Sequence, residues 1–390
     1  MIGVNATAGQ ALKLLQTSSL SHVSGLARDA SGNAPTAYLG LPGTKVDAAI
    51  TAIMNILLDA QGNANISIVA KDASAYVRTG DGDDTLSMDV HQVGYLRSGK
   101  GNDNISIRTS TPSEAARVHH AEGNRQFSTV GDVDSGDGND AVAIDSHGHV
   151  DNIDTGNGDD TLTVRTSVEH NDPNFFGHAG AMRIQTGAGD DAIMIPAPNG
   201  LVSVIQAGAG NDTLEIAGRY VSGIYGDEGD DTLRLTADRW VSGVWGGDGN
   251  DTIEVTAPTI GMVNGGKGDD TIVLNNTVGT VSAVDFNVGD GHDDVQTNSA
   301  LFIRRFSGVN TRFDMSKAAV ERVGDNALKI TFDDADDSIT IHLTGDMAGK
   351  PIALDFYKSG VLVIRRDDND APALPKMTVA ANPLVLTRNV

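Results

Sequence analysis

The stretch between Gly208 and Leu274 contains four successive copies of one short pattern. Each copy has a glycine-rich segment that ends in an aspartate, and these aspartates follow one another at steps of 19, 20 and 19 residues. Apolar residues stand two and four positions after each aspartate, as Leu214 and Ile216 do after Asp212. A fixed period of this kind is typical of a solenoid, in which every repeat forms one turn and buries its apolar face against the next. The chain is therefore expected to fold as a stack of turns.

Each part of the repeat has a physical role. Alternating apolar and polar residues after the aspartate predict a β-strand with one buried face. The glycines allow the positive φ angles that a tight turn requires. Because the aspartate recurs at one place in every turn, stacking would align carboxylates and backbone carbonyls along one edge. Calcium suits such an edge, since it accepts six to eight oxygen ligands in adaptable geometry.

The glycine-rich segments resemble the RTX, or haemolysin-type, calcium-binding repeat, G-G-x-G-x-D-x-U-x with an apolar residue at U. The resemblance covers about residues 62–345 and implies several bound Ca²⁺ ions. It implies that the glycines and the aspartate of each segment form the metal sites: Gly80, Gly82, Asp84; Gly99, Gly101, Asp103; Gly136, Gly138, Asp140; Gly156, Gly158, Asp160; Gly187, Gly189, Asp191; Gly208, Gly210, Asp212; Gly226, Gly229, Asp231; Gly247, Gly249, Asp251; Gly266, Gly268, Asp270; Gly289, Gly291, Asp293.

The array departs from the family pattern in two ways. RTX repeats are often nine residues long and carry a calcium turn on both edges, whereas the period of about twenty here predicts a single metal-lined edge. In the first half of the array the first glycine of the pattern is replaced by a hydroxyl residue. The replacements are Thr79, Ser98, Ser135, Thr155 and Thr186.

Two steps in the array are longer than the others. Asp103 and Asp140 are 37 residues apart, and Asp160 and Asp191 are 31 apart. We interpret the excess, within residues 104–135 and 165–183, as loops that leave the solenoid, commonly on one face. We expect less regular stacking of the calcium loops across these two steps.

A second set of apolar residues predicts a second wall in each turn. Each loop is preceded by an apolar residue, which stands three positions before the second glycine position of the repeat, as Val77 does before Gly80. This recurrence predicts another inward-facing strand. These residues are Val77, Leu96, Val133, Ile153, Ile184, Ile205, Ile224, Val244, Val263 and Phe286. The segment Gly62–Ile68 is interpreted as a first turn that has the strand but carries Ala64 in place of the aspartate.

The fold predicted from these patterns is an all-β, right-handed parallel β-solenoid with a cap at each end. Residues 46–60 have Ile50, Ile53, Met54, Leu57 and Leu58 at helical spacing, which predicts an amphipathic helix that covers the open N-terminal end. The predicted segments are 1–61 with this helix, the solenoid at 62–298, a β-rich C-terminal cap at 299–364 and a flexible tail at 365–390.

Composition narrows the partners and the location. The net charge of −24 argues against nucleic acid and anionic membranes as partners. Cysteine is absent, which excludes disulfides and thiolate metal sites, and no apolar stretch is long enough to cross a membrane. The first residues lack a Sec-type signal peptide. An RTX-like protein without one resembles the clients of bacterial type I export, so an extracellular location is expected; export by a type III apparatus stays open.

Aromatic residues repeat at the same period in two neighbouring turns. Tyr220 stands 20 residues before Trp240, and Tyr225 stands 20 before Trp245. Stacked turns in register would pair these rings, with Tyr225 and Trp245 facing outward. Such an outward ladder could bind sugar rings, although neighbouring turns also stack aromatic rings for packing alone.

Two classes of function are compatible with these features. The first is a secreted calcium-binding structural or interaction protein that folds on meeting extracellular calcium and acts in adhesion, at a surface or in virulence; its partner, a glycan or cell-surface component, is not specified by the sequence. The second is a carbohydrate-active β-helix enzyme, a lyase, epimerase or hydrolase, which the two insertions, the aromatic ladder and Arg165, Arg183, Arg219 and Arg239 suggest. We favour the first, because no catalytic motif or spaced carboxylate pair is evident.

Overall fold

The protein folds as an all-β parallel β-solenoid with about 10 turns of about 20 residues, as predicted. The computed structural model describes residues 62–109, 130–167, 180–308, 311–333, 336–357, 359–367 and 377–378, together with 12–16, 36–39 and 53–58. Only the backbone is described at 12–16, 36–39, 53–58, 70–73, 307–308, 311–312 and 377–378. Two compact units, residues 1–208 and 209–390, are distinguished by their contacts and are described one at a time.

Unit 1 consists of strands whose succession follows the repeat. They are β1 (Leu12–Gln16), β2 (Thr36–Leu39), β3 (Ile53–Leu58), β4 (Asn65–Arg78), β5 (Thr85–Arg97), β6 (Asn104–Thr109), β7 (Val133–Asp134), β8 (Ala141–Ser146), β9 (Val150–Asp154), β10 (Thr161–Thr166), β11 (Gly180–Ala188) and β12 (Ala192–Ala209).

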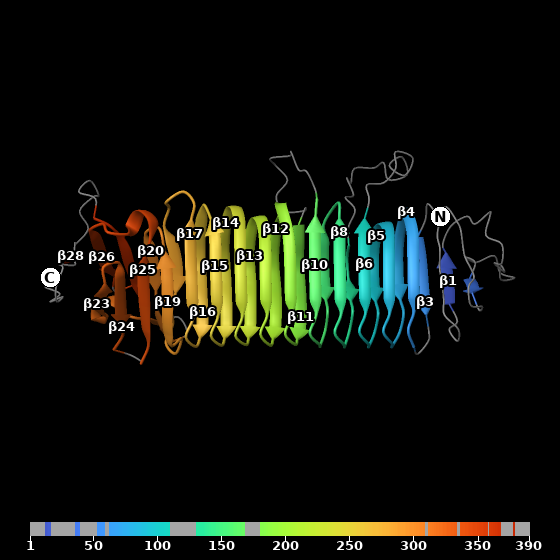
Figure 1. Ribbon diagram of the computed structural model, residues 1–390, viewed down its shortest axis with the longest axis horizontal. Coiled ribbons are helices and arrows are strands. Elements are labelled where there is room, and N and C mark those ends of the chain that lie inside the picture. Colours follow the sequence, from blue (N-terminus) through green and yellow to red (C-terminus); the bar gives the residue numbers. More distant parts are fainter. Residues whose placement is uncertain are drawn as a thin grey trace. The chain divides into compact units, whose positions relative to one another are not determined.

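Each turn of unit 1 has two walls joined at a glycine-rich loop (Figure 1). The motif wall follows the loop aspartate, and the second wall precedes the loop. Strand β5 covers both walls: its first half pairs in parallel with β6, and its second half pairs in parallel with β7. On the motif wall every other side chain is buried, as in β6, because the apolar residues of the repeat face inward and pack between the walls.

The two long steps leave the stack in register. Strands β6 and β8 pair in parallel from Asn104 with Ala141 onward, although residues 110–129 lie between them. Strands β10 and β12 pair from Thr161 with Ala192 onward, across residues 168–179. The prediction of less regular stacking at these steps is therefore wrong. Parallel pairing constrains only the residues that enter the walls, so extra chain between them does not shift the register.

The predicted N-terminal helix is wrong where the structure describes it. Residues Ile53–Leu58 form strand β3, which pairs in parallel with β4 and antiparallel with β1. Six residues of which five are apolar, IMNILL, fit a buried strand as well as a helix, and periodicity alone does not separate the two. As a strand, this segment pairs with the backbone N–H and C=O groups at the edge of β4, which a helix would leave unpaired. The rest of residues 46–60 lies outside the described part of the chain.

Unit 2 begins with long strands that run through both walls and ends with short ones. They are β13 (Thr213–Glu228), β14 (Thr232–Asp248), β15 (Thr252–Ala257), β16 (Thr259–Lys267), β17 (Thr271–Asn276), β18 (Ser282–Asp285), β19 (His292–Thr297), β20 (Leu301–Arg304), β21 (Phe306–Gly308), β22 (Thr311–Arg312), β23 (Ala319–Gly324), β24 (Ala327–Thr331), β25 (Ser338–Leu343), β26 (Ile352–Tyr357), β27 (Val361–Arg366) and β28 (Met377–Thr378), with 3-10 helices η2 (Met315–Lys317) and η3 (Gly345–Met347).

The two walls of unit 2 continue through successive parallel pairings (Figure 1). The motif wall runs from β14 through β15, β17 and β19 to β25, and the second wall runs from β14 through β16 and β18 to β20. Among the described residues the helices are only three residues long, and none could cross a membrane.

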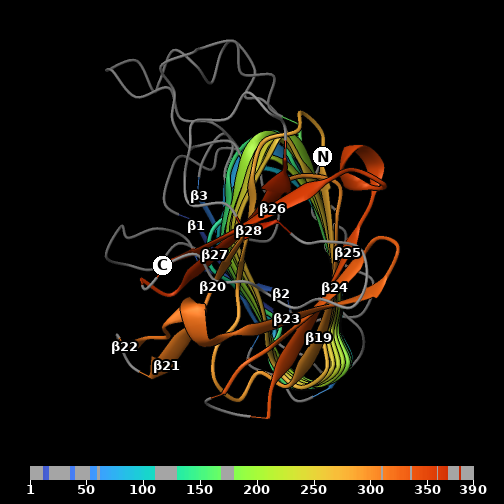
Figure 2. The same cartoon turned by 90° about the vertical axis from the view of Figure 1, so that its left-hand side faces the viewer.

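Antiparallel strands end the stack, which confirms the predicted C-terminal β cap. On the motif wall β25 pairs antiparallel with β24, and β24 with β23. On the second wall β20 pairs antiparallel with β27, β27 with β26, and β26 with β28. Figure 2 faces this end, with β24 and β25 on one side and β20, β27 and β28 on the other. The cap thus covers the open edges of the last parallel turn, which would otherwise be free to pair with other chains.

The predicted second-wall residues all belong to the core. Each of the ten is at most 1% exposed: Val77, Leu96, Val133, Ile153, Ile184, Ile205, Ile224, Val244, Val263 and Phe286. The first turn is also as expected, since Ala64, Ile66 and Ile68 are buried and Asn65 begins β4.

Candidate metal-binding column

The loops that carry the repeat glycines stack on one another with very close backbone approach. In the loop that ends at Asp251, Gly247 and Gly249 have φ angles of 138° and 145°, a region that favours glycine. A Cβ atom on Gly249 would lie 2.1 Å from the carbonyl oxygen of Gly229, one turn earlier. One loop departs from the pattern: Asp227 takes the place of a glycine, with φ of 79°, and pairs in register with Gly247.

Within each unit the aspartates that end the loops form a column, and we call these aspartates the inner ladder. All are at most 2% exposed. In nine of them, Oδ1 accepts a hydrogen bond from the backbone N–H at the same position one turn earlier, over 2.6 to 3.2 Å. The donor and acceptor pairs are Ala64 and Asp84, Asp84 and Asp103, Asp103 and Asp140, Asp140 and Asp160, and Asp160 and Asp191 in unit 1; and Asp212 and Asp231, Asp231 and Asp251, Asp251 and Asp270, and Asp270 and Asp293 in unit 2.

The second carboxylate oxygen of the inner ladder is buried without a hydrogen-bond partner among the described residues. This holds for Oδ2 of Asp84, Asp103, Asp140, Asp160, Asp231, Asp251, Asp270 and Asp293. Burial disfavours the ionised form, and neighbouring carboxylates disfavour it further. Burial, as the main cause, raises the pKa to about 6 at Asp103 and Asp251, to about 7 at Asp160, Asp231 and Asp270, and to about 9 at Asp293.

A second column of hydrogen bonds, the outer ladder, runs the opposite way. The residue before each inner-ladder aspartate is Asp or Asn in nearly every loop, and its Oδ1 accepts from the backbone N–H one turn later, over 2.7 to 3.0 Å. The acceptors are Asn63, Asp83, Asn102, Asn139 and Asp159 in unit 1, and Asn211, Asp230, Asn250 and Asp269 in unit 2. Our sequence reasoning missed this ladder, although the recurring Asp or Asn was visible.

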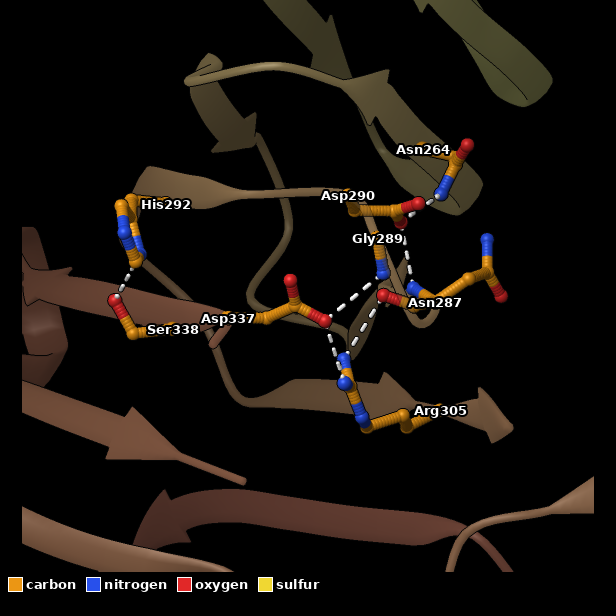
Figure 3. A network of polar contacts seen from close by, with 8 residues as sticks. All are labelled: Asn264, Asn287, Gly289, Asp290, His292, Arg305, Asp337 and Ser338. Atoms are coloured by element: carbon orange, nitrogen blue, oxygen red, sulfur yellow. Dashed lines mark hydrogen bonds and ion pairs between the residues drawn. The ribbon is translucent and has the colours of Figure 1, made fainter. Parts of the chain in front are cut away.

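The last motif loop, at the end of unit 2, is held by a network of its own (Figure 3). Asp290 accepts hydrogen bonds from the backbone N–H of Asn287 at 2.5 Å and from the Asn264 amide at 3.2 Å. Asp337 accepts from the backbone N–H of Gly289 at 2.9 Å and from the Arg305 guanidinium at 2.7 Å. The cap strands thereby fix the loop that closes the array.

The ligands on offer suit a hard cation. Within the part of the chain that the structure describes, no three His, Asp or Glu side chains converge as a metal cluster. A cation at the column would therefore combine inner-ladder carboxylate oxygens with backbone carbonyls. Oxygen-only sets of this kind fit calcium and do not fit zinc, which prefers nitrogen and sulfur. Lysines already neutralise two places on the edge, where Lys100 pairs with Asp137 and Lys267 lies 2.6 Å from Asp248.

The predicted aromatic pairs form in unit 2. Tyr220 is in register with Trp240, and Tyr225 with Trp245. The Tyr225 and Trp245 rings are stacked, with centroids 4.6 Å apart and planes within 4°, whereas the Tyr220 and Trp240 rings are tilted at 5.5 Å. All four side chains are half-buried. The next turn places Thr259 and Asn264 at these positions, so neither pair extends into it.

A polar cleft of about 350 Å³ lies on the second wall of unit 1. Its polar lining is Arg97, Asp132, Asp134, Asn152, Asp154, Arg183, Gln185 and Gln206. Val204, which also lines it, is 45% exposed and has a φ of 59°, which is rare for a β-branched residue.

Two carboxylates of the cleft occupy successive turns. Asp134 pairs in register with Asp154, and burial together with the Asp154 charge raises the pKa of Asp134, against the opposing effect of Arg97. Asp154 accepts a hydrogen bond from the Gln185 amide at 2.7 Å. Sequence reasoning did not identify this pair, although both residues stand six positions before an inner-ladder aspartate.

The comparisons with known proteins add no relative: no protein-family model and no curated protein matches this chain.

Proposed function

We propose that this protein is a secreted, RTX-like calcium-binding solenoid whose fold is stabilised by calcium and which serves as a structural or interaction protein. The observation that carries the proposal is the column of buried Oδ2 atoms in the inner ladder. A buried carboxylate oxygen without a partner is costly unless a proton or a cation compensates it. At neutral pH a cation does so without requiring these aspartates to remain protonated.

The residues that would hold the metal are the glycines and the aspartate of each repeat. Inner-ladder aspartates would supply the carboxylate oxygens, and the loop glycines would allow the backbone to turn its carbonyls toward the ion. Calcium bound there would supply positive charge to a column of like charges. Oδ1 of each aspartate would remain on the neighbouring backbone N–H, so the ladder itself needs no rearrangement.

Calcium concentration connects this site to secretion. Sites of the extracellular class bind calcium with dissociation constants of about 10⁻⁴ to 10⁻³ M, so they fill outside cells and stay empty in the cytosol. Millimolar calcium is then about one to ten times the dissociation constant, and binding to the folded chain alone stabilises it by about 0.4–1.4 kcal/mol per site. A chain of this kind would remain loosely folded for export, by a type I or similar apparatus, and would stiffen outside. Adhesive and surface roles would both use such a stack.

Chemical unfolding with and without calcium tests the proposal. We expect millimolar calcium at pH 7.5 to raise the urea midpoint, followed by circular dichroism, relative to EDTA. Magnesium should raise it less, because it demands near-ideal octahedral geometry. Equilibrium dialysis should find several calcium ions per chain. Equal midpoints in EDTA and calcium would refute the proposal.

A matched pair of variants locates the effect. Asp231→Asn removes a charge from the inner ladder, whereas Asp230→Asn removes one from the outer ladder, where Asn211 and Asn250 already stand in the adjacent turns. We expect Asp231→Asn to reduce both the calcium-induced rise in the urea midpoint and the number of bound ions. Asp230→Asn should match the unmodified protein in both measurements. Equal losses in both variants would place the ion outside the inner ladder.

The cleft of unit 1 favours a second candidate, the binding of a carbohydrate along the second wall. Its carboxylates, amides and guanidinium groups offer both acceptors and donors to sugar hydroxyls, and its formal charge of three aspartates against two arginines disfavours an acidic sugar. Calorimetric titration with neutral and uronate oligosaccharides would test this. We expect binding of a neutral sugar that Asp154→Asn weakens and Asp248→Asn, outside the cleft, does not; release of reducing ends would indicate hydrolysis. If neither the neutral nor the uronate oligosaccharides bind, this candidate function is rejected.

A further inference from the structure

The residue that begins each motif loop differs between the two units. In the loops that lie wholly in unit 1 it is a serine or threonine that is at most 2% exposed: Thr79, Ser98, Ser135, Thr155 and Thr186. In three successive loops of unit 2 it is a glycine: Gly226, Gly246 and Gly265. These positions are equivalent, because each stands five residues before an inner-ladder aspartate.

The hydroxyls of unit 1 form a hydrogen-bonded series of their own. Each donates to the backbone carbonyl of the equivalent residue in the next turn, as Thr79 does to Ser98 at 3.0 Å and Ser98 to Ser135 at 2.9 Å. The series continues from Ser135 to Thr155, from Thr155 to Thr186 and from Thr186 to Ala207, over 2.9 to 3.2 Å. Each also lies against the carboxylate of its own loop: the Ser98 hydroxyl, for example, opposes the burial that raises the pKa of Asp103. The hydroxyl thus donates to the carbonyl and lies beside the carboxylate, whose Oδ2 has no hydrogen-bond partner of its own.

The glycines of unit 2 provide no such group. A Cβ atom on Gly246 would lie 2.1 Å from Oδ2 of Asp251 and 2.3 Å from the carbonyl oxygen of Gly265, so both oxygens crowd the place where a side chain would begin. Gly226 has the same surroundings, with Oδ2 of Asp231 at 2.2 Å and the Gly246 carbonyl oxygen at 2.5 Å.

These oxygens are both acceptors, and no side chain at the glycine position donates to them. Oδ2 of Asp231, Asp251 and Asp270 is buried without a hydrogen-bond partner among the described residues, as it is in the loops of unit 1, but here no hydroxyl lies beside it or donates to the neighbouring carbonyl. Two adjacent acceptors in a buried place repel one another unless a positive charge or a proton lies between them. In unit 1 the hydroxyl occupies the place between the two oxygens and gives its proton to the carbonyl, whereas in unit 2 that place is left to a cation or a proton from outside the chain.

We propose that the two kinds of loop divide the array: the glycine-led loops of unit 2 bind calcium and depend on it, and the hydroxyl-led loops of unit 1 hold together without it. This inference rests on the proposed function and specifies which of its sites are used. Calcium then acts on residues 226–270 and leaves the loops that begin at Thr79, Ser98, Ser135, Thr155 and Thr186 unchanged.

Hydrogen–deuterium exchange followed by mass spectrometry of the full-length protein reports on both sets of loops in one experiment. We expect calcium, compared with EDTA, to slow exchange at least tenfold in peptides that cover 226–270 and to leave peptides that cover 79–109 and 130–160 within a factor of two. Trp240 and Trp245 are the two tryptophans of the chain, so intrinsic fluorescence gives an independent titration of unit 2 alone. The ion count by dialysis should match the glycine-led loops only.

Reciprocal variants test the donor argument directly. Gly246→Ser with Gly265→Ser installs hydroxyls in unit 2, and we expect these loops to lose at least half of their calcium-induced protection while they exchange slowly in EDTA. Gly246→Ala with Gly265→Ala adds the same bulk without a donor, so its loops should exchange fast in EDTA. In unit 1, Ser135→Gly with Thr155→Gly should create loops whose exchange calcium slows. The serine and alanine variants add similar bulk and differ in the hydroxyl. A difference between them therefore reports the donor and not the packing.

The outcomes distinguish this inference from the proposed function. If calcium protects both sets of loops equally, or protects unit 1 alone, the division is wrong while calcium binding stands. If calcium protects neither and dialysis finds none bound, both are wrong. If the serine and alanine variants behave alike, the hydroxyl does not replace the ion, and the donor argument fails.

Discussion

Oδ1 of Asp251 accepts a hydrogen bond from the backbone N–H of Asp231, one turn earlier, at 2.8 Å, while Oδ2 of Asp251 is buried without a partner. One carboxylate thus has two different oxygens: the first joins neighbouring turns, and the second requires a proton or a cation. The same division recurs along the inner ladder. It separates the structural work of the repeat from its proposed metal chemistry, and it allows each to be tested alone.

The first prediction concerns pH in the absence of metal. Burial raises the pKa of Asp160, Asp231 and Asp270 from 3.8 to about 7, and that of Asp293 to about 9. Between about pH 4 and these values the folded chain binds more protons than the unfolded one, so its free energy of unfolding falls as pH rises. We expect the urea midpoint in EDTA to be highest near pH 4 and to decline toward pH 9.

Calcium should oppose that decline, because it replaces the proton at the ionised carboxylates. The same titration in millimolar calcium should therefore be flatter between pH 6 and 9, and the two curves should converge at acidic pH. A midpoint in EDTA that is constant or rises with pH would contradict the raised pKa values.

The second prediction separates the two oxygens of Asp251. Asp251→Ala leaves the buried N–H of Asp231 without its acceptor, which costs about 1–3 kcal/mol. Asp251→Asn keeps Oδ1 and turns the unpartnered oxygen into a donor beside the Gly265 carbonyl. In EDTA at pH 8 we expect Asp251→Asn to be more stable than the unmodified protein and Asp251→Ala to be less stable. Urea unfolding followed by circular dichroism measures all three.

Asp230→Asn serves as the control for this comparison, because it changes only the exposed outer ladder. Its midpoint should lie within about 0.5 kcal/mol of the unmodified protein, as for most surface substitutions. If Asn and Ala at position 251 destabilise equally, the hydrogen bond that Oδ1 accepts does not hold the turns together.

The third prediction concerns the buried ion pair that closes the array. Arg305 is fully buried, lies 2.7 Å from Asp337 and has its guanidinium over the Phe332 ring at 4.0 Å. Arg305→Met leaves the Asp337 charge buried, which costs about 3–5 kcal/mol. Adding Asp337→Asn removes that charge while it keeps an acceptor for the Gly289 N–H. We expect the double variant to be more stable than Arg305→Met in thermal unfolding; a double variant that is less stable would count against a penalty from unpaired charge.

The fourth prediction concerns the chain between β6 and Val130. Since β6 and β8 remain in register, residues 110–129 are not needed for the stack. Replacing them by the three residues that join β8 to β9, His147–His149, shortens the connection and should stabilise the chain by about 1–2 kcal/mol through a smaller loop-closure entropy. The check is urea unfolding, with exchange at Asp103 and Asp140 as the local reporter. A loss of several kcal/mol would show that this segment packs on the solenoid.

Much of this architecture follows from local patterns. The apolar alternation after each loop is enough to place Leu214 and Ile216 inside, and the offset from the loop glycines places Ile224 and Val244 on the second wall. The segment around Ile53 is a different case. Its apolar residues fit a helix and a strand equally, and β4 decides between them because it offers an unpaired edge.

The sequence by itself determined the period, the two apolar walls and the return of one aspartate to the same place in every turn, because these are properties of single repeats. Only the tertiary structure decided which oxygen of each aspartate is satisfied, that the inner and outer ladders run in opposite directions, and that Asp134 and Asp154 share a cleft. Those relationships join residues in different turns. They exist only once stacking fixes the distance and register between backbones, which no single repeat contains.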